Sequence, residues 1–564
     1  MFVLNVYTSV KTAVIKRSTD LLTKDEIWGL TKEVNAAILE ELTTWVQYKC
    51  FERRPLRGAR NVMDSRHVFK WKHRKGKDGQ MTRIIRCRMA LRGFRDLDAG
   101  VLETFAGTAK RASQRLLSSE AACRPDWVYV AADVPTAFLQ GMTYEEMHEL
   151  TGEAPREVNF TLPPGSAAIL RQVPGYETFD ENTECLHCIK PGTGCKDAPR
   201  AFSMKLARVT RSRECDTRPT TWDPELEVKH VEASSVPTGS TGTEAAGDEL
   251  SGASGQELVL MLSKHVDDLK IAGQKHHVDQ LISHIEKVFG KMKGEYESFT
   301  NCGVRQTRSE DGSVTLDQDE YISALIPIQH TDLVKAKADQ PAEGSLPDLF
   351  VSLLGAAAYA LLTQHHVAVY IVALQRAKNK LLNRHIMQLN SVVKAMQQIK
   401  ARVVFPAMEC SRRIVVHSDG SFKREEESGY GMRGAACMRM GRCRKTGKEI
   451  CHLLDAVARS HKLVCRSSFG SELLAACGAA DGLQAFILTL HEMLRGPASP
   501  SETRRLREEG GYAVPAELVI DGYVGLLGAA HGPGEATVRE QHGWTPLVAL
   551  RPAAHQADHR PAVV

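Results

Sequence analysis

The sequence lacks a long uninterrupted apolar run and a regular cysteine framework, and its net charge is only +5. The first twenty residues contain no long apolar region, which argues against a secretory signal peptide. The most apolar long stretch, residues 351–374, contains Gln364, His365 and His366. We therefore expect a buried helix there rather than a membrane span, and an intracellular protein with no membrane partner.

The fourteen cysteines fit a reducing compartment, because their spacing shows no disulfide framework. Cys185 and Cys188 have the spacing of zinc ligands, with His187 and Cys195 close by. A structural zinc site needs a second such pair, which the sequence does not supply. We therefore expect ordinary reduced cysteines in this segment.

The length of 564 residues predicts several domains. With 43% hydrophobic and 25% charged residues, the composition is typical of a globular protein. Charge is unevenly distributed: residues 51–95 hold fifteen Lys and Arg against three acids, a local balance of +12. Such a segment is typical of a phosphate-binding surface, although a solvated charged face is the alternative.

Local patterns predict the elements of the first half of the chain. Residues 76–79, GKDG, lie between two strand-like segments and predict a β-hairpin. Apolar periodicity predicts helices over 26–45 and 110–122, and the run WVYVAADV at 127–134 predicts a strand.

Further along, residues 231–257 are rich in Ser, Thr, Gly and Glu and predict a flexible insertion. Two apolar strands then flank a turn at 264–268, and a helix over 278–289 should end at Gly290. A second unit begins near residue 411 with a strand, followed by a helix from 471 and the strand ELVID at 517–521. The segment from 525 has little periodicity and predicts an unfolded or unrelated tail.

Three carboxylates occupy unusual positions in these strands. Asp133 ends an apolar strand, and Asp267 and Asp268 lie at the turn of an apolar hairpin. An Asp pair alone more often marks a turn or a solvated acidic patch. Acids on a buried hairpin, however, repel one another unless a cation neutralises them, and Mg²⁺ prefers such oxygen ligands. Two Mg²⁺ ions are the standard device for in-line displacement at phosphorus.

Five segments, in order, resemble motifs of one family, the copia-type retrotransposon polymerases. NVMDSRHVFKWKHRKGKDGQMTRIIRCRMALRGF resembles N-V-x-x-S-[KR]-W-V-F-K…K-A-R-L-V-A-R-G-F, and ETFAGTAK resembles E-T-F-A-P-V-A-[KR]. VYVAADVPTAFLQG resembles D-V-x-T-A-F-L-x-G, GCKDAPRAF resembles G-L-K-Q-A-P-R-A-W, and KHVDDLKIAG resembles Y-V-D-D-[IL]-x-[IL]-x-G. The similarity runs from about residue 37 to 401 and continues into a ribonuclease H region.

The resemblance implies roles for individual residues. Asp133, Asp267 and Asp268 would be the metal-binding triad, and Phe138 would crowd a ribose 2′-hydroxyl or simply pack in the core. Cations near the nucleotide or template would come from four residues of two motifs: Arg86, Arg88, Lys196 and Arg200.

Four positions depart from the family pattern: Pro135, Cys195, Asp197 and His265. Asp197 matters most, because an acid beside a triphosphate adds repulsion unless a base such as Lys196 compensates for it. None of the four removes a predicted metal ligand.

The second unit resembles the family's ribonuclease H domain. RRIVVHSDGSF ends near Asp419, RSSFGSELLAACGAADGLQ puts Glu472 early on a helix, and AELVIDGYVGLLGA puts Asp521 at a strand end. Such acids would hold two Mg²⁺ ions that activate water against RNA. No fourth acid stands out, and His555 and Asp558 are candidates by composition alone. Protease, integrase and zinc-knuckle motifs are absent, so we expect a fragment or decayed copy of a longer polyprotein.

The expected fold is α+β: reverse-transcriptase fingers, palm and thumb, then a ribonuclease H-like α/β domain. The expected function is Mg²⁺-dependent, RNA-directed DNA synthesis from a primed RNA or DNA template and deoxynucleoside triphosphates, in a cytoplasmic particle or the nucleus. The alternative is an inactive remnant that at most binds nucleic acid. The expected divisions are an N-terminal extension (1–36), fingers and palm (37–340), thumb or connection (341–410), ribonuclease H-like domain (411–524) and tail (525–564).

Overall fold

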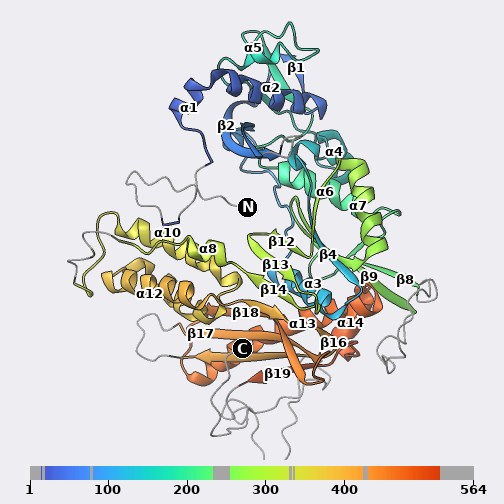
Figure 1. The fold of residues 1–564 in the computed structure, drawn as a ribbon, viewed down its shortest axis with the longest axis vertical. Helices are drawn as coiled ribbons and strands as arrows, with labels where there is room; N and C mark the ends of the chain where they lie inside the picture. The colour runs from blue at the N-terminus through green and yellow to red at the C-terminus, as the bar shows by residue number, and fades with distance from the viewer. Residues whose placement is uncertain are drawn as a thin grey trace, which may run out of the picture.

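Three bodies surround a central sheet (Figure 1). The mixture of helices and sheets confirms the α+β class. An upper lobe lies above the central sheet, a helical lobe lies to the left in this view, and a C-terminal sheet lies below. The computed structural model describes residues 20–75, 81–232, 255–329, 337–422 and 430–520, together with residues 14, 15 and 333.

The upper lobe is a five-stranded sheet in the order β1-β6-β5-β2-β3, covered by helices. Antiparallel pairing of β2 and β3 sets Trp71 opposite Ile85 and confirms the predicted hairpin. The helix predicted over 26–45 is instead two helices, because the backbone of Leu30 leaves the helical region between them. The elements are α1 Lys24–Gly29, α2 Thr31–Gln47, β1 Phe51–Pro55, β2 Val62–Lys75, β3 Met81–Leu91, β5 Asn159–Thr161, α5 Ser166–Leu170 and β6 Glu184–Cys188.

The central sheet has six strands in the order β11-β4-β10-β9-β8-β7. Its helix α7 buries Val278, Leu281, Ile285 and Phe289 on one face and ends at Gly290, as predicted. The elements are α3 Arg111–Cys123, β4 Trp127–Asp133, α4 Tyr144–Thr151, α6 Ala198–Thr210, β7 Arg218–Pro219, β8 Leu226–Glu232, β9 Gln256–His265, β10 Asp268–Gln274, α7 Lys275–Phe289 and β11 Lys293–Tyr296.

The insertion predicted over 231–257 is too long at both ends. Val231 pairs with Glu257 and Glu232 pairs with Gln256, so these four residues continue the β8–β9 ladder. Cross-strand pairing here overrides the polar composition, since a ladder needs backbone partners more than apolar side chains. Residues 233–254 of the predicted insertion lie outside the described residues.

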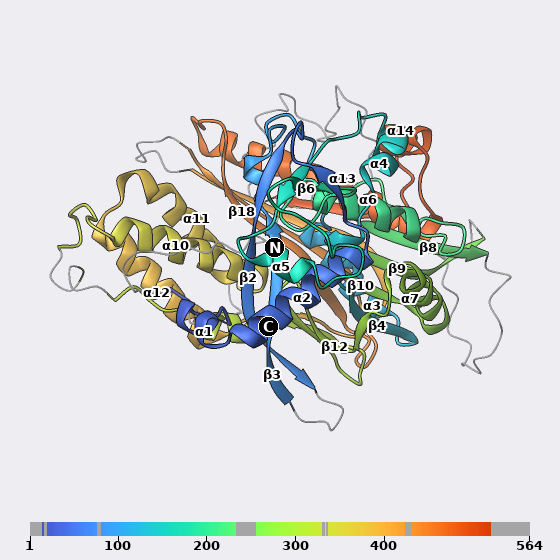
Figure 2. The same ribbon diagram turned by 90° about the horizontal axis from the view of Figure 1, so that it is seen from above.

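A small sheet and a helical lobe follow the central sheet. The small sheet has the order β12-β13-β14-β15, with strands β12 Ser298–Asn301, β13 Val304–Arg308, β14 Val314–Asp317 and β15 Val403–Phe405. The lobe contains α8 Asp319–Ser323, α10 Leu346–Tyr359, α11 Ala368–Arg376 and α12 Asn383–Ile399, which share one apolar core. Figure 2 shows this lobe on one side of the molecule and α6 and α7 on the other.

The prediction of a single buried helix over 351–374 is correct about burial but wrong about continuity. The segment is buried in large part but divides into α10 and α11, with Thr363 and Gln364 between them. The amide of Gln364 donates to the carbonyl of Ala401 at 2.6 Å and accepts from its N–H at 3.2 Å. A buried polar side chain that needs these partners favours a break over a continuous helix.

The C-terminal sheet has the order β18-β17-β16-β19, in which β19 runs parallel to β16 and the other pairs are antiparallel. Helix α13 packs across β16, β17 and β19. The expected strand near 411 and the helix near 471 are present, whereas β17, β18 and α14 were not predicted. The elements are β16 Met408–Ser421, β17 Met432–Cys443, β18 Glu449–Ser460, α13 Ser468–Arg495, α14 Pro500–Glu509 and β19 Ala516–Ile520.

Helix α3 joins the central and C-terminal sheets into one core. Leu116 and Leu117 of α3 belong to the same buried cluster as Tyr129 of β4, Val416 of β16 and Leu483 of α13. Ionic contacts cross the same seam: Arg111 lies 2.5 Å from Asp455, and Arg439 lies 2.8 Å from Glu120.

Among the described residues, α13 alone is long and apolar enough to pass a length-and-composition test for a membrane span. Its buried side chains, including Leu483, Phe486 and Leu490, pack in the core shared with the C-terminal sheet.

Candidate active site

Asp133 and Asp268 lie side by side at one end of the central sheet. They are directly opposed in the antiparallel register of β4 and β10. Side chains alternate along β4, so Asp133 shares a face with Trp127 and Tyr129, which pack toward α3. Directly opposed residues have Cβ atoms only about 5 Å apart. Two carboxylates from segments far apart in the sequence therefore share one small region.

Asp267 joins them from the turn between β9 and β10. The turn is short: β9 ends at His265, Val266 adopts a left-handed backbone with φ 59°, and β10 begins at Asp268. The N–H of Val134 donates to the carbonyl of Asp267 at 3.2 Å, which ties the turn to the end of β4. All three predicted acids are thus brought together.

The electrostatics of this acidic cluster (Asp133, Asp267 and Asp268) favour a cation. Burial, with repulsion from Asp267 and Asp133, raises the pKa of Asp268 to about 6. Burial and Asp267 also raise the pKa of Asp133, although Arg86 and Arg88 oppose the shift. Ionising Asp133 and Asp268 therefore costs free energy that a bound cation would recover.

The donor set fits Mg²⁺, which usually takes one or two protein carboxylates and completes its shell with water and substrate phosphates. Within the described ranges, no group of three or more His, Cys, Asp or Glu side chains is arranged to hold a metal ion by itself. An ion at this cluster would accordingly depend on ligands from outside the protein.

Two basic residues of the upper lobe act on the cluster. Arg86 and Arg88 alternate with Cys87 on β3, so both side chains leave the same face of that strand. Both lower the pKa of Asp133, and burial together with Arg88 lowers the pKa of Arg86. The predicted cations are therefore within electrostatic reach of the predicted acids.

Lys196 and Arg200 are held elsewhere. Arg200 forms a two-pronged ion pair with Glu153, at 2.6 and 2.7 Å. The amine of Lys196 donates to the carbonyl of Ala99 at 3.3 Å. Their loop is fixed to the end of β3, because a Cβ on Gly194, which has φ 99°, would lie 2.2 Å from the carbonyl of Leu91.

The negative charge of Asp197 is balanced by Arg156, a residue that was not singled out from the sequence. Asp197 is fully buried and ion-paired with Arg156, which also lies 2.6 Å from Asp96. Burial raises the pKa of Asp197, and the guanidinium opposes the shift. A basic neighbour therefore does compensate for Asp197, but it is Arg156; among the described residues Lys196, the example given from the sequence, forms no ion pair with Asp197.

Phe138 lies at the junction of the upper lobe and the central sheet. It sits on the short 3₁₀ helix Ala137–Gln140 and packs against the cores of both bodies. This contact accounts for a packing role and is compatible with a second role at the nucleotide.

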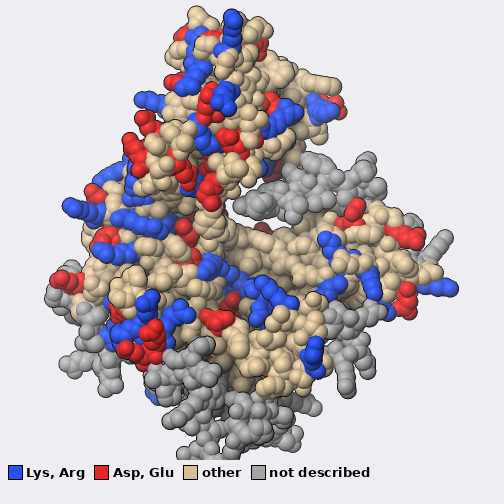
Figure 3. Space-filling view, turned by 180° about the vertical axis from the view of Figure 1, so that it is seen from behind, with Lys and Arg blue, Asp and Glu red and all other residues tan. Residues whose placement is uncertain are grey.

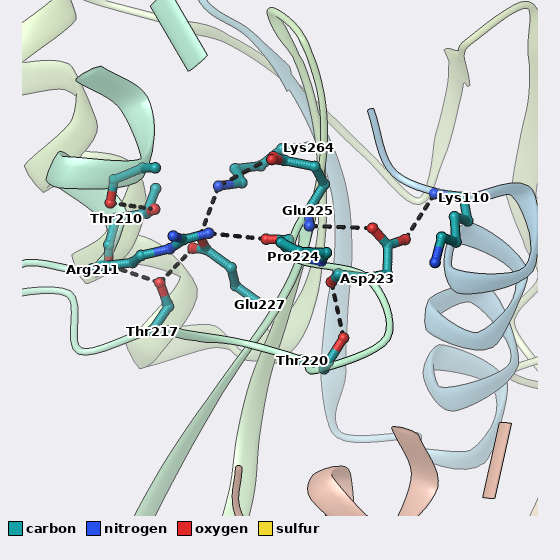
Figure 4. A network of polar contacts seen from close by, with 11 residues as sticks. Lys110, Thr210, Arg211, Thr217, Thr220, Asp223, Pro224, Glu225, Glu227 and Lys264 are labelled. Atoms are coloured by element: carbon teal, nitrogen blue, oxygen red, sulfur yellow. Dashed lines mark hydrogen bonds and ion pairs between the residues drawn. The ribbon is translucent and has the colours of Figure 1, made fainter. Parts of the chain in front are cut away.

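A buried ionic network surrounds Lys264 near the end of β9 (Figure 4). Lys264 of β9, three residues before Asp267, is 2% exposed and lies 2.7 Å from Glu227 and 3.3 Å from Glu225. Arg211 also lies 2.7 Å from Glu227. This network was not predicted from the sequence, although a lysine near the end of a largely apolar strand was a usable signal.

A second pair of acids lies where the C-terminal sheet meets α13. Asp419 is exposed on β16, and the N–H of the next residue, Gly420, donates to Glu472 Oε2 at 3.0 Å. Asp419 and Glu472, two acids predicted from separate segments of the sequence, therefore lie close together. Asp521, His555 and Asp558 lie outside the described residues.

A scan against protein-family models and a search of curated proteins both find no match to this chain. Function is therefore inferred from the geometry above and from the sequence motifs.

Proposed function

We propose that the chain is a Mg²⁺-dependent, RNA-directed DNA polymerase of the copia retrotransposon type. The observation that supports it most is the register that opposes Asp133 and Asp268 beside Asp267. In this proposal the upper lobe corresponds to fingers, the central sheet to the palm and the helical lobe to the thumb. Figure 3 shows the surface hollowed between the upper and helical lobes, where a primed template would lie.

The chemistry assigned to the site follows from charge. Bound Mg²⁺ would activate the primer 3′-hydroxyl and stabilise the leaving pyrophosphate. The acidic cluster would hold and orient these ions. Arg86 and Arg88 would contact the triphosphate, since guanidinium groups match phosphate oxygens in pairs. Catalysis would come mainly from positioning and charge stabilisation.

The direct test is primer extension by the purified chain on RNA and DNA templates with Mg²⁺. Replacing a predicted metal ligand, as in Asp133→Asn, Asp267→Asn or Asp268→Asn, should lower the rate by about a hundredfold or more. Asp279→Asn is the matched control, because Asp279 is an exposed acid on α7 that pairs with Lys275. Equal synthesis by wild type and Asp267→Asn would reject the assignment of Asp267.

A second variant tests the nucleotide pocket. Phe138→Val should raise ribonucleotide incorporation relative to deoxynucleotide incorporation, because the smaller side chain leaves room for a 2′-hydroxyl. An unchanged ratio with a lower melting temperature would leave Phe138 with its packing role alone.

The inactive-remnant alternative predicts a different result from the same protein. Nucleic acid would bind with strong salt dependence through residues 51–95, and no primer would be extended. The ion pair of Asp197 with Arg156 removes one motive for this alternative, since the acid's charge is locally balanced.

Ribonuclease H-like hydrolysis is a second candidate activity, favoured by the convergence of Asp419 and Glu472. The C-terminal sheet would then cut the RNA strand of a hybrid, with two Mg²⁺ ions held by Asp419, Glu472 and Asp521. Glu472→Gln should abolish cutting, whereas Asp481→Asn, an exposed acid on the same helix, should not. Hydrolysis that survives Glu472→Gln would exclude this candidate.

A further inference from the structure

A cleft of about 440 Å³ lies between the edge of the central sheet and the end of α13. We call it the seam cleft; its walls include Asp216, Arg218, His230, Gln256, Arg495 and Gly496. The strands β8 and β9 lie beside α13 and α14 at the lower right of Figure 1. The volume falls within the range of small-molecule sites, which is roughly 300–1,000 Å³.

The seam cleft has two arginines and one acid. Arg218 and Asp216 are both largely exposed, and their closest charged atoms are 3.5 Å apart. Within the described part of the chain, Arg495 has no carboxylate at ion-pairing distance. Among its described lining residues, the cleft therefore carries a net positive charge.

The remaining wall is preformed. His230 Nε2 lies 2.8 Å from the carbonyl of Met493, so this nitrogen is the donor. The bond joins β8 of the central sheet to α13. Burial lowers the pKa of His230, against the opposing effect of the hydrogen bond to Met493. Gln256 lies against Gly496, where a Cβ would approach its Oε1 to 2.5 Å. The two arginines thus flank a fixed polar wall.

We propose that the seam cleft binds a phosphate-bearing ligand through Arg218 and Arg495. Planar guanidinium forks match phosphate oxygens in geometry and charge. Arg218 and Arg495 line the cleft from different bodies. The phosphate could come from a free nucleotide or pyrophosphate, or from a nucleic-acid backbone.

This site is separate from both acidic sites. Gln256 of the cleft begins β9, whereas Asp267 lies just beyond the other end of that strand. Glu472 lies near the start of α13 and Arg495 at its end, so about 35 Å of helix separates them at 1.5 Å per residue. A ligand in the seam cleft would contact both the central sheet and α13. It would therefore stabilise the contact between the two bodies, whatever the outcome for polymerase activity.

The test is isothermal titration of the full chain with inorganic pyrophosphate, without divalent metal and at low ionic strength. A second arm uses a 20-base-pair DNA duplex. Arg218→Gln and Arg495→Gln should each weaken binding by about tenfold, because each removes a charge-assisted contact. Arg504→Gln is the matched control, since Arg504 is an exposed arginine on the neighbouring α14 outside the cleft.

Asp216→Asn gives a test of opposite sign. Removing this acid should tighten binding several-fold, because it competes with the ligand for Arg218. The backbone of Asp216 has φ 51°, a conformation that Asn also tolerates, so the fold should be kept.

The outcomes separate the two ligand sources. Pyrophosphate binding that weakens in the two cleft variants identifies a free phosphate ligand. Weakening confined to the duplex identifies a nucleic-acid backbone. Absence of binding in both arms, or equal effects of Arg495→Gln and Arg504→Gln, overturns the proposal.

Discussion

Asp268 is the direct cross-strand partner of Asp133, so two acids that are 135 residues apart face each other across one pair of strands. Like charges directly opposed in a sheet destabilise it. Asp267 adds a third charge from the adjoining turn. Such an arrangement lowers stability unless a cation binds, which makes stability a readout of the site that does not require catalysis.

The first prediction concerns the pH dependence of the metal-free protein. The pKa of Asp268 in the folded state is raised to about 6 from 3.8, so the folded chain binds this proton more tightly than the unfolded chain does. The contribution of Asp268 to the unfolding free energy is therefore fully present below pH 4 and is lost as pH rises through 6. Chemical unfolding at several pH values should show a loss on the order of 2 kcal/mol.

Asp268→Asn should remove that slope and raise the melting temperature at pH 7, and Asp279→Asn should do neither. Added Mg²⁺ should stabilise the wild type more than Asp268→Asn, because ligand binding to the folded state alone adds stability. An identical Mg²⁺ response in both proteins would contradict a metal site at this cluster.

Local patterns predicted the strands that carry the acids. The β2–β3 hairpin, the strand ending at Asp133 and the helix ending at Gly290 all follow from periodicity and turn residues. Each signal lies within about twenty neighbouring residues. Periodicity alone could not predict that the three acids lie together. That prediction came from the resemblance of five ordered motifs to one family.

Contacts between distant segments could not be predicted in this way. Arg156 balances Asp197 from 41 positions away, and Arg439 reaches Glu120 from more than 300. Ion pairing leaves no periodic trace in a sequence, because any Arg can reach any acid that the fold brings near it. Strands β17 and β18 were missed for a related reason: most of their residues are half-buried, so they lack a clear apolar alternation.

The second prediction concerns the ionic network around Lys264. Lys264→Met would leave Glu227 fully buried with Arg211 as its remaining cation. We expect a loss of about 3 kcal/mol in unfolding free energy, because an under-compensated buried charge is costly. Lys264→Arg keeps the charge and should lose less. Equal losses in denaturant titrations would show that packing, not charge, sets the effect.

The third prediction concerns the ion pair between Glu120 of α3 and Arg439 of the C-terminal sheet, which lies away from the seam cleft. Burial alone would raise the pKa of Glu120, but Arg439 and Arg124 lower it to about 2. Stability from Glu120 is therefore present above pH 4.5 and is lost as pH falls toward 2. Arg439→Met should cost about 3–5 kcal/mol near neutral pH, since one partner of a buried pair is removed.

The double variant Glu120→Gln with Arg439→Met is the control for that pair. Replacing both partners should cost less than the sum of the two single changes, as measured by a double-mutant cycle. Strict additivity would mean that the two side chains do not interact in solution.

The last prediction compares Gly420, whose N–H donates to Glu472, with Gly482, which lies ten residues beyond Glu472 on α13. A Cβ on Gly420 would lie 2.6 Å from the backbone oxygen of Ser471, whereas a Cβ on Gly482 meets nothing within 4 Å. Gly420→Ala should therefore force β16 away from α13 and cost about 1–3 kcal/mol. Gly482→Ala, inside the same helix, should instead stabilise the chain by about 0.5–1 kcal/mol, because alanine favours helix. Thermal unfolding gives both signs in one experiment. A Gly420→Ala variant as stable as the wild type would argue against a close strand–helix contact at the Asp419–Glu472 site, whereas Gly482→Ala controls for helix propensity away from that contact.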